Sequence, residues 1–170
     1  GGAGFIGSQI VDGLLRKGHT VAVLDNLAKG RRSHVDAAAT FYDVDITDAV
    51  GVMAAFQDFR PQVVDHHAAQ SSVSRSMREP DVDVTVNVGG SIKVLEASRQ
   101  FGVERFIFAS TGGALYGEPQ SLPCGEGHSV RPLSIYGASK YAFEVYLHTY
   151  HQTYGLPVTI LRYANVYGPR

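Results

Sequence analysis

Two side chains in the second half of the sequence, Tyr136 and Lys140, have the spacing expected of a proton-transfer pair. They lie four residues apart in the segment YGASK, at the start of a helix-patterned stretch, and therefore on one helix face. A phenol with a pKa of about 10 is a poor base at neutral pH, but a nearby cation stabilises the phenolate and lowers that pKa. The pair indicates a tyrosine base activated by a lysine, although the same spacing is also common on exposed helix faces.

Two hydroxyl groups, those of Ser110 and Thr111, directly follow a strand-like apolar segment at residues 105–109 (RFIFA). In a parallel sheet these hydroxyls would lie at the carboxyl edge, where such folds bind their ligands. This placement makes Ser110 and Thr111 candidates to act beside Tyr136 and Lys140.

A third group of residues, the glycine loop GGAGFIG at positions 1–7, is spaced for binding a phosphate. Gly1, Gly4 and Gly7 stand at three-residue intervals before an apolar, helix-patterned run. Glycines allow a tight turn and a close approach of the backbone to a pyrophosphate, and the N–H groups at a helix start favour the anion. Asp25 ends the next strand-like run, where a dinucleotide-binding fold places the acid that binds a ribose.

The elements that would position these residues alternate along the chain. Helices are expected at residues 8–17, 84–101 and 136–154, with a shorter one, capped by Thr47 or Asp48, that ends before Pro61. Strands are expected at residues 20–24, 40–44, 62–65, 105–109 and 158–162, and a long loop rich in Gly and Pro at 110–133. This alternation predicts an α/β fold with a doubly wound parallel sheet, the Rossmann fold.

The sequence begins directly at the glycine loop, without the buried strand that should precede it. We therefore expect a fragment that lacks the first strand and the carboxyl-terminal substrate region. Residues 1–163 would form the dinucleotide-binding domain, and residues 164–170 would begin the substrate-binding region. Because loss of a central strand exposes two ladder edges, we expect that these 170 residues do not fold alone.

Composition excludes several classes of protein. Apolar residues make up 44% of the chain and no apolar run approaches twenty residues, which argues against disorder and against a membrane span. The formal charge of −1, with acids and bases interspersed, gives no basic field for nucleic acid or an anionic membrane. The single cysteine, Cys124, can form neither an internal disulfide nor a cysteine metal cluster, which fits a reducing compartment such as the cytoplasm.

Three further groups are interpreted as structural. His66 and His67 would point to opposite faces of a strand, so they are poorly placed to bind one metal ion, and we expect no metal site. The basic residues Lys29, Arg31 and Arg32 are interpreted as a solvated loop. A helical stripe of large apolar side chains is expected in the core or in a dimer seam, namely Phe143, Tyr146, Leu147 and Tyr150.

Eight segments occur in an order that resembles a known family. They are GGAGFIG, DNLAKG, Asp45-Ile46, HHAAQSSV, VNVGGSIKVLEA, FASTGGALYGE, YGASK and RYANVYGPR. Together they resemble the extended short-chain dehydrogenase/reductases, and within them the nucleotide-sugar epimerases of the NAD-dependent epimerase/dehydratase family. The resemblance runs over the full length. It implies NAD as cofactor, a nucleotide-diphosphate sugar as substrate, and a homodimer paired through the helices expected at residues 84–101 and 136–154.

The resemblance also implies roles for individual residues. The implied cofactor contacts, beyond the glycines and the Tyr136–Lys140 pair, are Phe5, Ile6, Asp25, Asn26, Asp45, Ile46, Ala68, Ala69, Gln70, Asn87 and Ala164. The implied substrate contacts are Thr111, Tyr136 and Asn165. Structural alternatives exist for three of them, because Asp25 and Asp45 could be strand-end or capping acids and Asn87 a buried amide satisfied by backbone. Asp25 should also repel a 2′-phosphate and so favour NAD over NADP.

The resemblance implies a mechanism in which Tyr136 removes a proton from a sugar hydroxyl while the carbon beneath gives hydride to NAD⁺. Lys140 would lower the phenol pKa and hold the nicotinamide ribose, and Thr111, with Ser110 beside it, would hydrogen-bond the same sugar oxygen. In a 4-epimerase the 4-keto sugar then turns over and takes the hydride back on its other face. The sugar itself stays open among UDP-hexoses, their N-acetylated forms and dTDP sugars.

Other activities of the family are weighed against this one. The 4,6-dehydratases need an Asp-Glu pair just after the catalytic threonine, and here those positions are Gly112 and Gly113. Epimerisation or ketone reduction is therefore favoured over dehydration. A non-catalytic dinucleotide sensor is a further alternative, since a Rossmann domain alone does not specify chemistry, but such a sensor has no need for an activated phenol.

Overall fold

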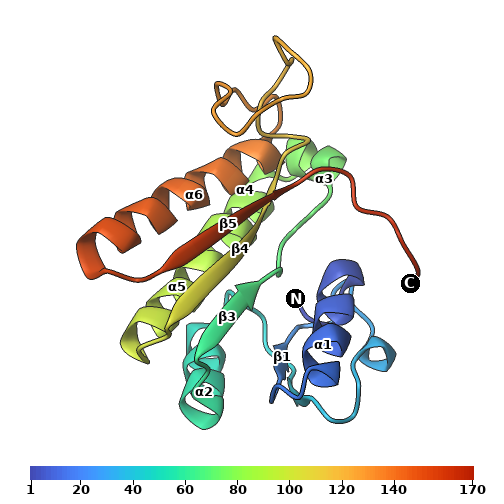
Figure 1. Ribbon diagram of the computed structural model, residues 1–170, viewed down its shortest axis with the longest axis vertical. Helices are drawn as coiled ribbons and strands as arrows, with labels where there is room; N and C mark the ends of the chain where they lie inside the picture. Colours follow the sequence, from blue (N-terminus) through green and yellow to red (C-terminus); the bar gives the residue numbers. More distant parts are fainter.

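The strands of the chain are all parallel and form two separate sheets (Figure 1). In the computed structural model, which describes residues 1–170, strand β1 (Ala22–Leu24) pairs with β2 (Thr40–Tyr42). The larger sheet has the order β3-β4-β5, built from Val63–His66, Arg105–Thr111 and Val158–Tyr163. All carboxyl ends of the strands in a sheet therefore meet at one edge, as expected for a parallel α/β fold.

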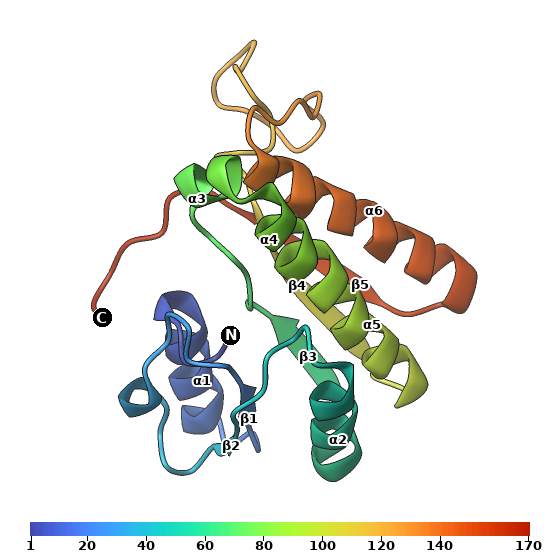
Figure 2. The same ribbon diagram turned by 180° about the vertical axis from the view of Figure 1, so that it is seen from behind.

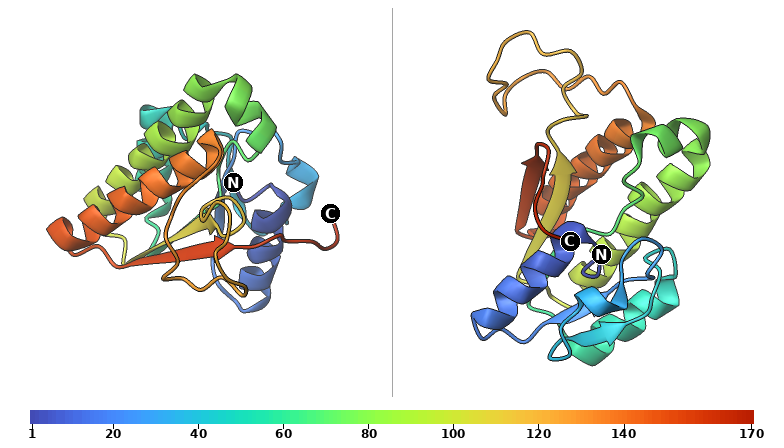
Figure 3. Two further views of the ribbon diagram at one scale, coloured as in Figure 1. Left: turned by 90° about the horizontal axis from the view of Figure 1, so that it is seen from above. Right: turned by 90° about the vertical axis from the view of Figure 1, so that its right-hand side faces the viewer.

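The chain has six α-helices, one 3₁₀ turn and one π-helical turn. They are α1 (Phe5–Arg16), the 3₁₀ turn η1 (Arg32–His34), α2 (Ala49–Phe59), α3 (Val73–Arg78), α4 (Pro80–Val84), the π-helical turn η2 (Thr85–Gly90), α5 (Ser91–Gln100) and α6 (Ile135–Tyr154). Helices α4, α5 and α6 lie against one face of β3-β4-β5, whereas α1 lies beside the smaller sheet (Figures 2 and 3). Within the layer formed by α4, α5 and α6, helix α6 carries the Tyr136–Lys140 pair and packs against β4 and β5.

Side-chain caps begin several of these helices. Asp48 accepts a hydrogen bond from the N–H of Val50 at the start of α2, which confirms one of the two caps predicted there. Ser134 accepts from the N–H of Gly137 at the start of α6, and Ser72 accepts from that of Arg75 at the start of α3. The Ser134 cap sets the first turn of α6, and with it the position of Tyr136.

Two apolar clusters anchor the two sheets. In the larger one, Phe106 and Phe108 of β4 pack against Phe143 and Leu147 of α6, and the rings of Phe108 and Phe143 lie 4.8 Å apart. All four side chains are at most 1% exposed. The smaller cluster joins α1 to β1 and comprises Ala3, Val11, Val21, Val23, Val35 and Ala39. Burial of these side chains fixes each helix on its own sheet.

The predicted stripe on α6 divides between core and surface. Phe143 and Leu147 are fully buried, whereas Tyr146 is 43% exposed. Tyr150 is partly buried, and its hydroxyl donates to the Glu96 carboxylate on α5. The first alternative, a core role, therefore holds for two of the four residues.

The observed elements differ from the expected ones in several places. The helix expected at residues 84–101 begins at Pro80, whose ring suits a first helical turn, and it passes through the π-helical turn η2 before α5. Helix α3 lies where no helix was expected. Strand β4 extends to Thr111, because Ser110 and Thr111 continue the ladder opposite Arg162 and Tyr163 of β5. These two hydroxyl residues therefore belong to the sheet edge and not to the loop that follows.

Strands β1 and β3 each pair on one side only, so the two sheets do not join. The parallel α/β fold is confirmed, while a strand ahead of the glycine loop remains a prediction.

Candidate active site

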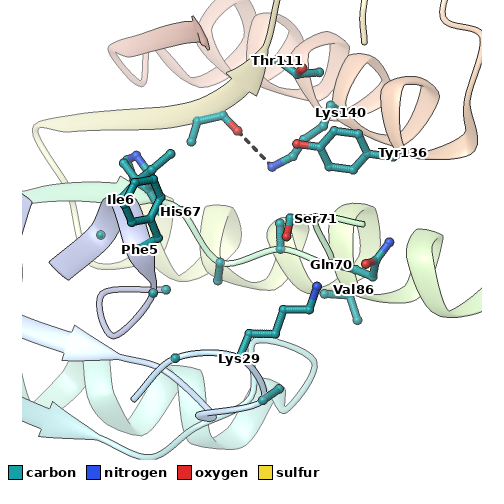
Figure 4. Close-up of a pocket in the computed structure, with 18 of the residues that line it drawn as sticks. Phe5, Ile6, Lys29, His67, Gln70, Ser71, Val86, Thr111, Tyr136 and Lys140 are labelled. Atoms are coloured by element: carbon teal, nitrogen blue, oxygen red, sulfur yellow. Dashed lines mark hydrogen bonds between the residues drawn. The ribbon is translucent and has the colours of Figure 1, made fainter. Parts of the chain in front are cut away.

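A cavity of about 740 Å³ runs along the carboxyl ends of the strands (Figure 4). Eighteen predicted site residues line it: Gly1, Gly4, Phe5, Ile6, Gly7, Asp25, Asn26, Asp45, Ile46, Ala68, Ala69, Gln70, Ser110, Thr111, Tyr136, Lys140, Ala164 and Asn165. They come from both sheets and from segments more than 150 residues apart in the sequence. The fold therefore gathers the glycine loop and the tyrosine–lysine pair into one site.

The glycine loop is shaped to admit a phosphate group. A Cβ on Gly7 would lie 2.2 Å from the carbonyl oxygen of Gly1, so the loop closes on itself without room for a side chain. A Cβ on Gly4 would meet only one atom within 4 Å, and Gly4 lines the cavity. Helix α1 begins just after Gly4 without a side-chain cap. Its first N–H groups are therefore available to an anion, which is what a dinucleotide pyrophosphate requires.

Asp25 holds the glycine loop in place. Its two carboxylate oxygens accept hydrogen bonds from the N–H of Ala3 at 3.0 Å and of Leu27 at 2.9 Å. The residue is only 8% exposed, so the structural role considered for it is present. Each carboxylate oxygen has a further lone pair, and Asp25 lines the cavity, so the position also suits a ribose hydroxyl.

Asn26 and Asp45 join the ends of β1 and β2. The Asn26 amide donates to the Asp45 carboxylate at 2.6 Å, and Asp45 also accepts from the N–H and the hydroxyl of Thr47. Partial burial alone would raise the pKa of Asp45, but the hydrogen bonds from Thr47 and Asn26 outweigh it and lower that pKa. The carboxylate therefore stays charged at the cavity wall.

Thr111, Tyr136 and Lys140 lie on the same side of the cavity (Figure 4). The Lys140 ammonium donates to the carbonyl oxygen of Ala109 at 2.9 Å and lies 4.7 Å from the centre of the Phe108 ring. It is 5.9 Å from the centre of the Tyr136 ring. The Thr111 hydroxyl accepts from the N–H of Ala114 at 3.2 Å. The ammonium is thus held by β4, close to the phenol but without a hydrogen bond to it.

The electrostatics of the pair differ from the sequence expectation. Burial raises the pKa of the Tyr136 phenol, and the Asp83 carboxylate raises it further. Burial lowers the pKa of Lys140 to about 8, while Asp83 opposes this change. The pKa of the phenol is therefore raised and not lowered as expected, because desolvation of the phenolate and the Asp83 charge both disfavour ionisation.

The Ser110 hydroxyl is turned away from the proposed chemistry. It hydrogen-bonds the carboxylate of Glu144, which forms an ion pair of 2.7 Å with Arg162 of β5. Arg162 in turn donates to the hydroxyl of Tyr116 at 2.9 Å. Although Ser110 lines the cavity, its oxygen is committed to this buried network, and Thr111 is the hydroxyl that remains for a ligand.

Asn87 is not among the residues that line the cavity, and the cofactor contact that the resemblance implies for it stays a prediction. Its amide accepts from the N–H of Gln70 at 2.8 Å and donates to the carbonyl of Gln70 at 2.9 Å. This two-way bond clamps the loop that carries Ala68, Ala69 and Gln70. The alternative of a buried amide satisfied by backbone therefore describes Asn87, which is only 2% exposed.

Several residues of the cavity were not assigned to the site from the sequence. Lys29 lines it and extends toward the segment of Gln70 and Ser71 (Figure 4). Lys29, Arg31 and Arg32 are all exposed, as expected of a solvated loop. His67 lines the cavity too, with its Nδ1 3.0 Å from the Asp65 carboxylate and its ring against Tyr163. Arg75 of α3 is the third such residue that lines the cavity. A basic residue three or four positions after Asp25 was the only available signal for Lys29.

The two histidines have different neighbours. His66 is 4% exposed, packs between Phe106, Phe108 and Phe143, and shares a 2.8 Å hydrogen bond with Ser91. Burial lowers its pKa well below the ordinary value, so it is neutral. His66 and His67 are thus packing and hydrogen-bonding groups, as interpreted from the sequence. No three His, Cys, Asp or Glu side chains gather as metal ligands, and no helix is long and apolar enough to cross a membrane.

The parallel sheets, the glycine loop ahead of a free helix start and the tyrosine–lysine pair define a dinucleotide-binding protein of the short-chain dehydrogenase/reductase type. A comparison with protein-family models agrees, and residues 1–170 match the NAD dependent epimerase/dehydratase family. The chain belongs to this family. The expected family and its cofactor, NAD, are confirmed at this level.

Individual relatives are nucleotide-sugar epimerases. A UDP-glucose 4-epimerase from Mycolicibacterium smegmatis is 45% identical over 177 residues, which cover 100% of this chain and 56% of that protein. The solved structure of the Thermus thermophilus UDP-glucose 4-epimerase with NAD is 55% identical, has a TM-score of 0.98, and is matched over 100% of this chain and 55% of its own. The Thermotoga maritima enzyme with UDP-glucose has the same TM-score at 47% identity and the same coverage. The chain thus spans about half the length of these relatives.

Proposed function

We propose that the whole protein is an NAD-dependent nucleotide-sugar 4-epimerase, acting on UDP-glucose and UDP-galactose or close analogues. One observation carries the proposal: Thr111, Tyr136 and Lys140 share a single cavity with a phosphate-binding glycine loop and Asp25. The relatives named UDP-glucose 4-epimerase, two of them solved with NAD or UDP-glucose, support the same activity.

The residues present fit NAD. The first N–H groups of α1 would hold the pyrophosphate, with Gly4 leaving room for it, and Asp25 would accept from the adenosine ribose. Asn26, Asp45 and Ile46 would border the adenine, and the clamped loop of Ala68, Ala69 and Gln70 would form the opposite wall. When bound, NAD⁺ would supply the hydride acceptor that the chain itself lacks, and a positive charge in addition to that of Lys140.

Tyr136 is the proposed proton-transfer group. In the structure the phenol favours its protonated form, because burial and Asp83 raise its pKa. A protonated phenol donates a hydrogen bond to a substrate oxygen, and it becomes a base only when positive charge is added beside it. Lys140 is held by Ala109, so it acts by charge and not by direct proton transfer. Thr111 would steady the same substrate oxygen.

The reaction is balanced without an external oxidant. Tyr136, once deprotonated beside the bound cofactor, would take the proton of the C4 hydroxyl, and bound NAD⁺ would supply the two-electron acceptor that oxidation of C4 to a ketone needs. Tyr136 would later return the same proton to the oxygen when C4 is reduced again from its opposite face, which completes the inversion. No acid or base acts at the neighbouring carbons, where Gly112 and Gly113 follow Thr111. This absence of carboxyl groups supports epimerisation over dehydration.

The assembly and place of action belong to the same proposal. Tyr141, Val145 and Tyr146 are between 38% and 50% exposed on the outer face of α6, which suits a homodimer seam with α4 and α5. Sedimentation of the whole protein tests this directly. Residues 164–170, with Ala164 and Asn165 in the cavity, would begin the substrate-binding region, and a cytoplasmic location fits the single cysteine.

The test is the Tyr136→Phe variant of the whole protein, which keeps the ring and removes the ionisable oxygen. Conversion of UDP-galactose to UDP-glucose should fall by about 10²- to 10⁴-fold, the usual contribution of general acid–base catalysis. Bound NAD should be retained, because the glycine loop and Asp25 are unchanged. Tyr141→Phe is the matched control, since Tyr141 lies on the same helix outside the cavity.

Near-normal turnover in Tyr136→Phe would show that another group transfers the proton. If the wild-type protein binds NAD but converts neither UDP- nor dTDP-sugars, the non-catalytic sensor would be the better description. Net consumption of NADH during turnover would identify a reductase and net production of NADH a dehydrogenase, since an epimerase is redox-neutral.

A further inference from the structure

Asp83 is a buried carboxylate behind the cavity. It lies on α4, is 0% exposed and does not line the cavity. Its Oδ2 accepts hydrogen bonds from the side-chain amides of Gln70 at 3.0 Å and Asn87 at 3.1 Å, while its Oδ1 has no partner. Burial of a carboxylate with one oxygen unsatisfied is costly, so this placement calls for a reason.

The two amides connect Asp83 to the helix that carries the proposed catalytic pair. Asn87 clamps Gln70 through backbone bonds and also donates to the Ser139 hydroxyl at 3.2 Å. The Ser139 hydroxyl donates to the carbonyl oxygen of Tyr136 at 3.0 Å. A continuous path of hydrogen bonds therefore runs from Asp83 to the first turn of α6, next to Lys140.

The other charged groups around this path are already paired. Glu144 on α6 pairs with Arg162, Arg75 on α3 pairs with Glu79, and His66 on β3 is neutral and bonded to Ser91. Tyr136 and Lys140 face the path from α6. The Asp83 carboxylate has no cationic side chain within ion-pair distance, unlike that of Glu144. Because no paired cation offsets it, the negative charge of Asp83 can change the pKa values of Tyr136 and Lys140.

We propose that Asp83 is a positioning residue for proton transfer. Its carboxylate holds the Gln70 and Asn87 amides against α6, and its charge keeps Lys140 protonated and Tyr136 neutral until the ligands are bound. The direction of the pKa changes agrees, since Asp83 raises the pKa of both groups. This inference rests on the proposed function in one respect, namely that Tyr136 is the group that transfers the proton.

The test is Asp83→Asn in the whole protein, titrated by tyrosinate absorbance. Asparagine keeps the shape and can accept from both amides, so mainly the charge is lost. The chain has nine tyrosines, and subtracting the spectrum of the matching Tyr136→Phe protein isolates one of them. NAD is kept reduced so that its ring carries no charge. We expect the Tyr136 midpoint to fall by about 0.5 to 1 pH unit, because a like charge near the phenolate has been removed.

The pH–rate profile should move in the same direction. Loss of the negative charge lowers the pKa of Tyr136 and of Lys140 together, so both limbs of the profile shift to lower pH. Two controls separate charge from structure. Asp81→Asn removes an exposed charge from the same helix, and Ser139→Ala cuts the hydrogen-bond path but keeps the charge. Neither should move the Tyr136 midpoint.

An unchanged midpoint in a folded Asp83→Asn protein would overturn the proposal, as would an equal shift in Ser139→Ala. If Asp83→Asn does not fold, the tyrosinate titration of the wild-type protein tests the proposal instead. A Tyr136 titration midpoint at or below the free value of about 10 would contradict the role of Asp83. The tyrosinate titration needs no turnover. It therefore tests Asp83 even if Tyr136→Phe shows that the proposed function is wrong.

Discussion

The two sheets build their parts of the site by different means. On the β1-β2 side, the glycine loop is shaped by backbone contacts: Gly7 packs against Gly1, and Asp25 receives two backbone N–H groups. On the β3-β4-β5 side, three ionisable side chains, Asp83, Lys140 and Glu144, are each at most 5% exposed. Binding a phosphate requires room and N–H donors, whereas proton transfer requires charges that water does not screen.

This difference has a cost in stability. Buried charges reduce the free energy of unfolding unless they are paired, while a glycine loop costs mainly backbone entropy. The catalytic side should therefore be sensitive to the loss or gain of charge, and the glycine side to the gain of a single carbon atom. The following substitutions in the whole protein separate these two sensitivities.

The largest effect on stability is expected from Glu144→Gln. It removes the partner of Arg162 and one acceptor of the Ser110 hydroxyl, and Glu144 is only 5% exposed. Breaking one side of a buried ion pair leaves an uncompensated charge, so the free energy of unfolding should fall by about 3 kcal/mol in a denaturant titration.

The matched control for Glu144 is Glu79→Gln. The Arg75–Glu79 pair has similar geometry, at 2.9 Å, but its side chains are 42% and 43% exposed. Its loss should change stability by about 0.5 kcal/mol or less, because solvent screens the pair. Equal losses in the two variants would show that burial of Glu144 does not set the cost.

A loss of similar or slightly smaller size is expected from Gly7→Ala. The new Cβ would lie 2.2 Å from the carbonyl oxygen of Gly1 and 2.9 Å from the Cα of Gly2, and neither backbone atom can move without opening the loop. We expect a loss of about 2 to 3 kcal/mol, together with weaker NAD binding measured by calorimetry.

Gly13→Ala is the control on the same helix. There the nearest atom to a new Cβ is the end of the Arg16 side chain at 3.9 Å, so the methyl group has room. Because alanine favours helix over glycine, this variant should gain up to about 1 kcal/mol and bind NAD as before. A Gly7→Ala protein with unchanged stability and affinity would contradict the role assigned to close packing.

How much of this could be predicted from the sequence differs between the two sides. The glycine loop and Asp25 act through local spacing, and spacing is visible in a sequence. The Tyr136–Lys140 pair was also found this way, because four residues in a helix define a face. The alternation of elements predicted the parallel fold, and Asp48 was identified as a helix cap from its type and position.

The rest depends on contacts between distant segments. Asp83 on α4 reaches Gln70 from another element, and Ser139 lies 52 residues from Asn87, so no local pattern marks their network. The raised pKa of Tyr136 was missed for the same reason, since it comes from burial that only the packing of α6 creates. Lys29 was taken as solvated because its loop is exposed, although its side chain reaches the cavity.

A smaller effect than the losses expected from Glu144→Gln and Gly7→Ala, and one of opposite sign, comes from Lys140→Met. The ammonium is 3% exposed, and burial lowers its pKa from 10.5 to about 8. Keeping it charged near neutral pH therefore costs on the order of 3 kcal/mol, by the free energy that corresponds to this pKa difference. Methionine fills the same space without charge but leaves the carbonyl of Ala109 unpaired, a loss of about 1 kcal/mol. The variant should be more stable than wild type by about 2 kcal/mol at pH 7.

The pH dependence identifies the cause. Between about pH 8 and pH 10.5 the unfolded chain holds the Lys140 proton and the folded chain does not, so the stability of the wild type rises with pH in that window. The advantage of Lys140→Met should therefore shrink above pH 8 and change sign between about pH 9.5 and pH 10, in urea titrations of both proteins across this range. Epimerase activity should be lost in the same variant. A pH-independent difference would mean that packing, and not the buried charge, separates the two proteins.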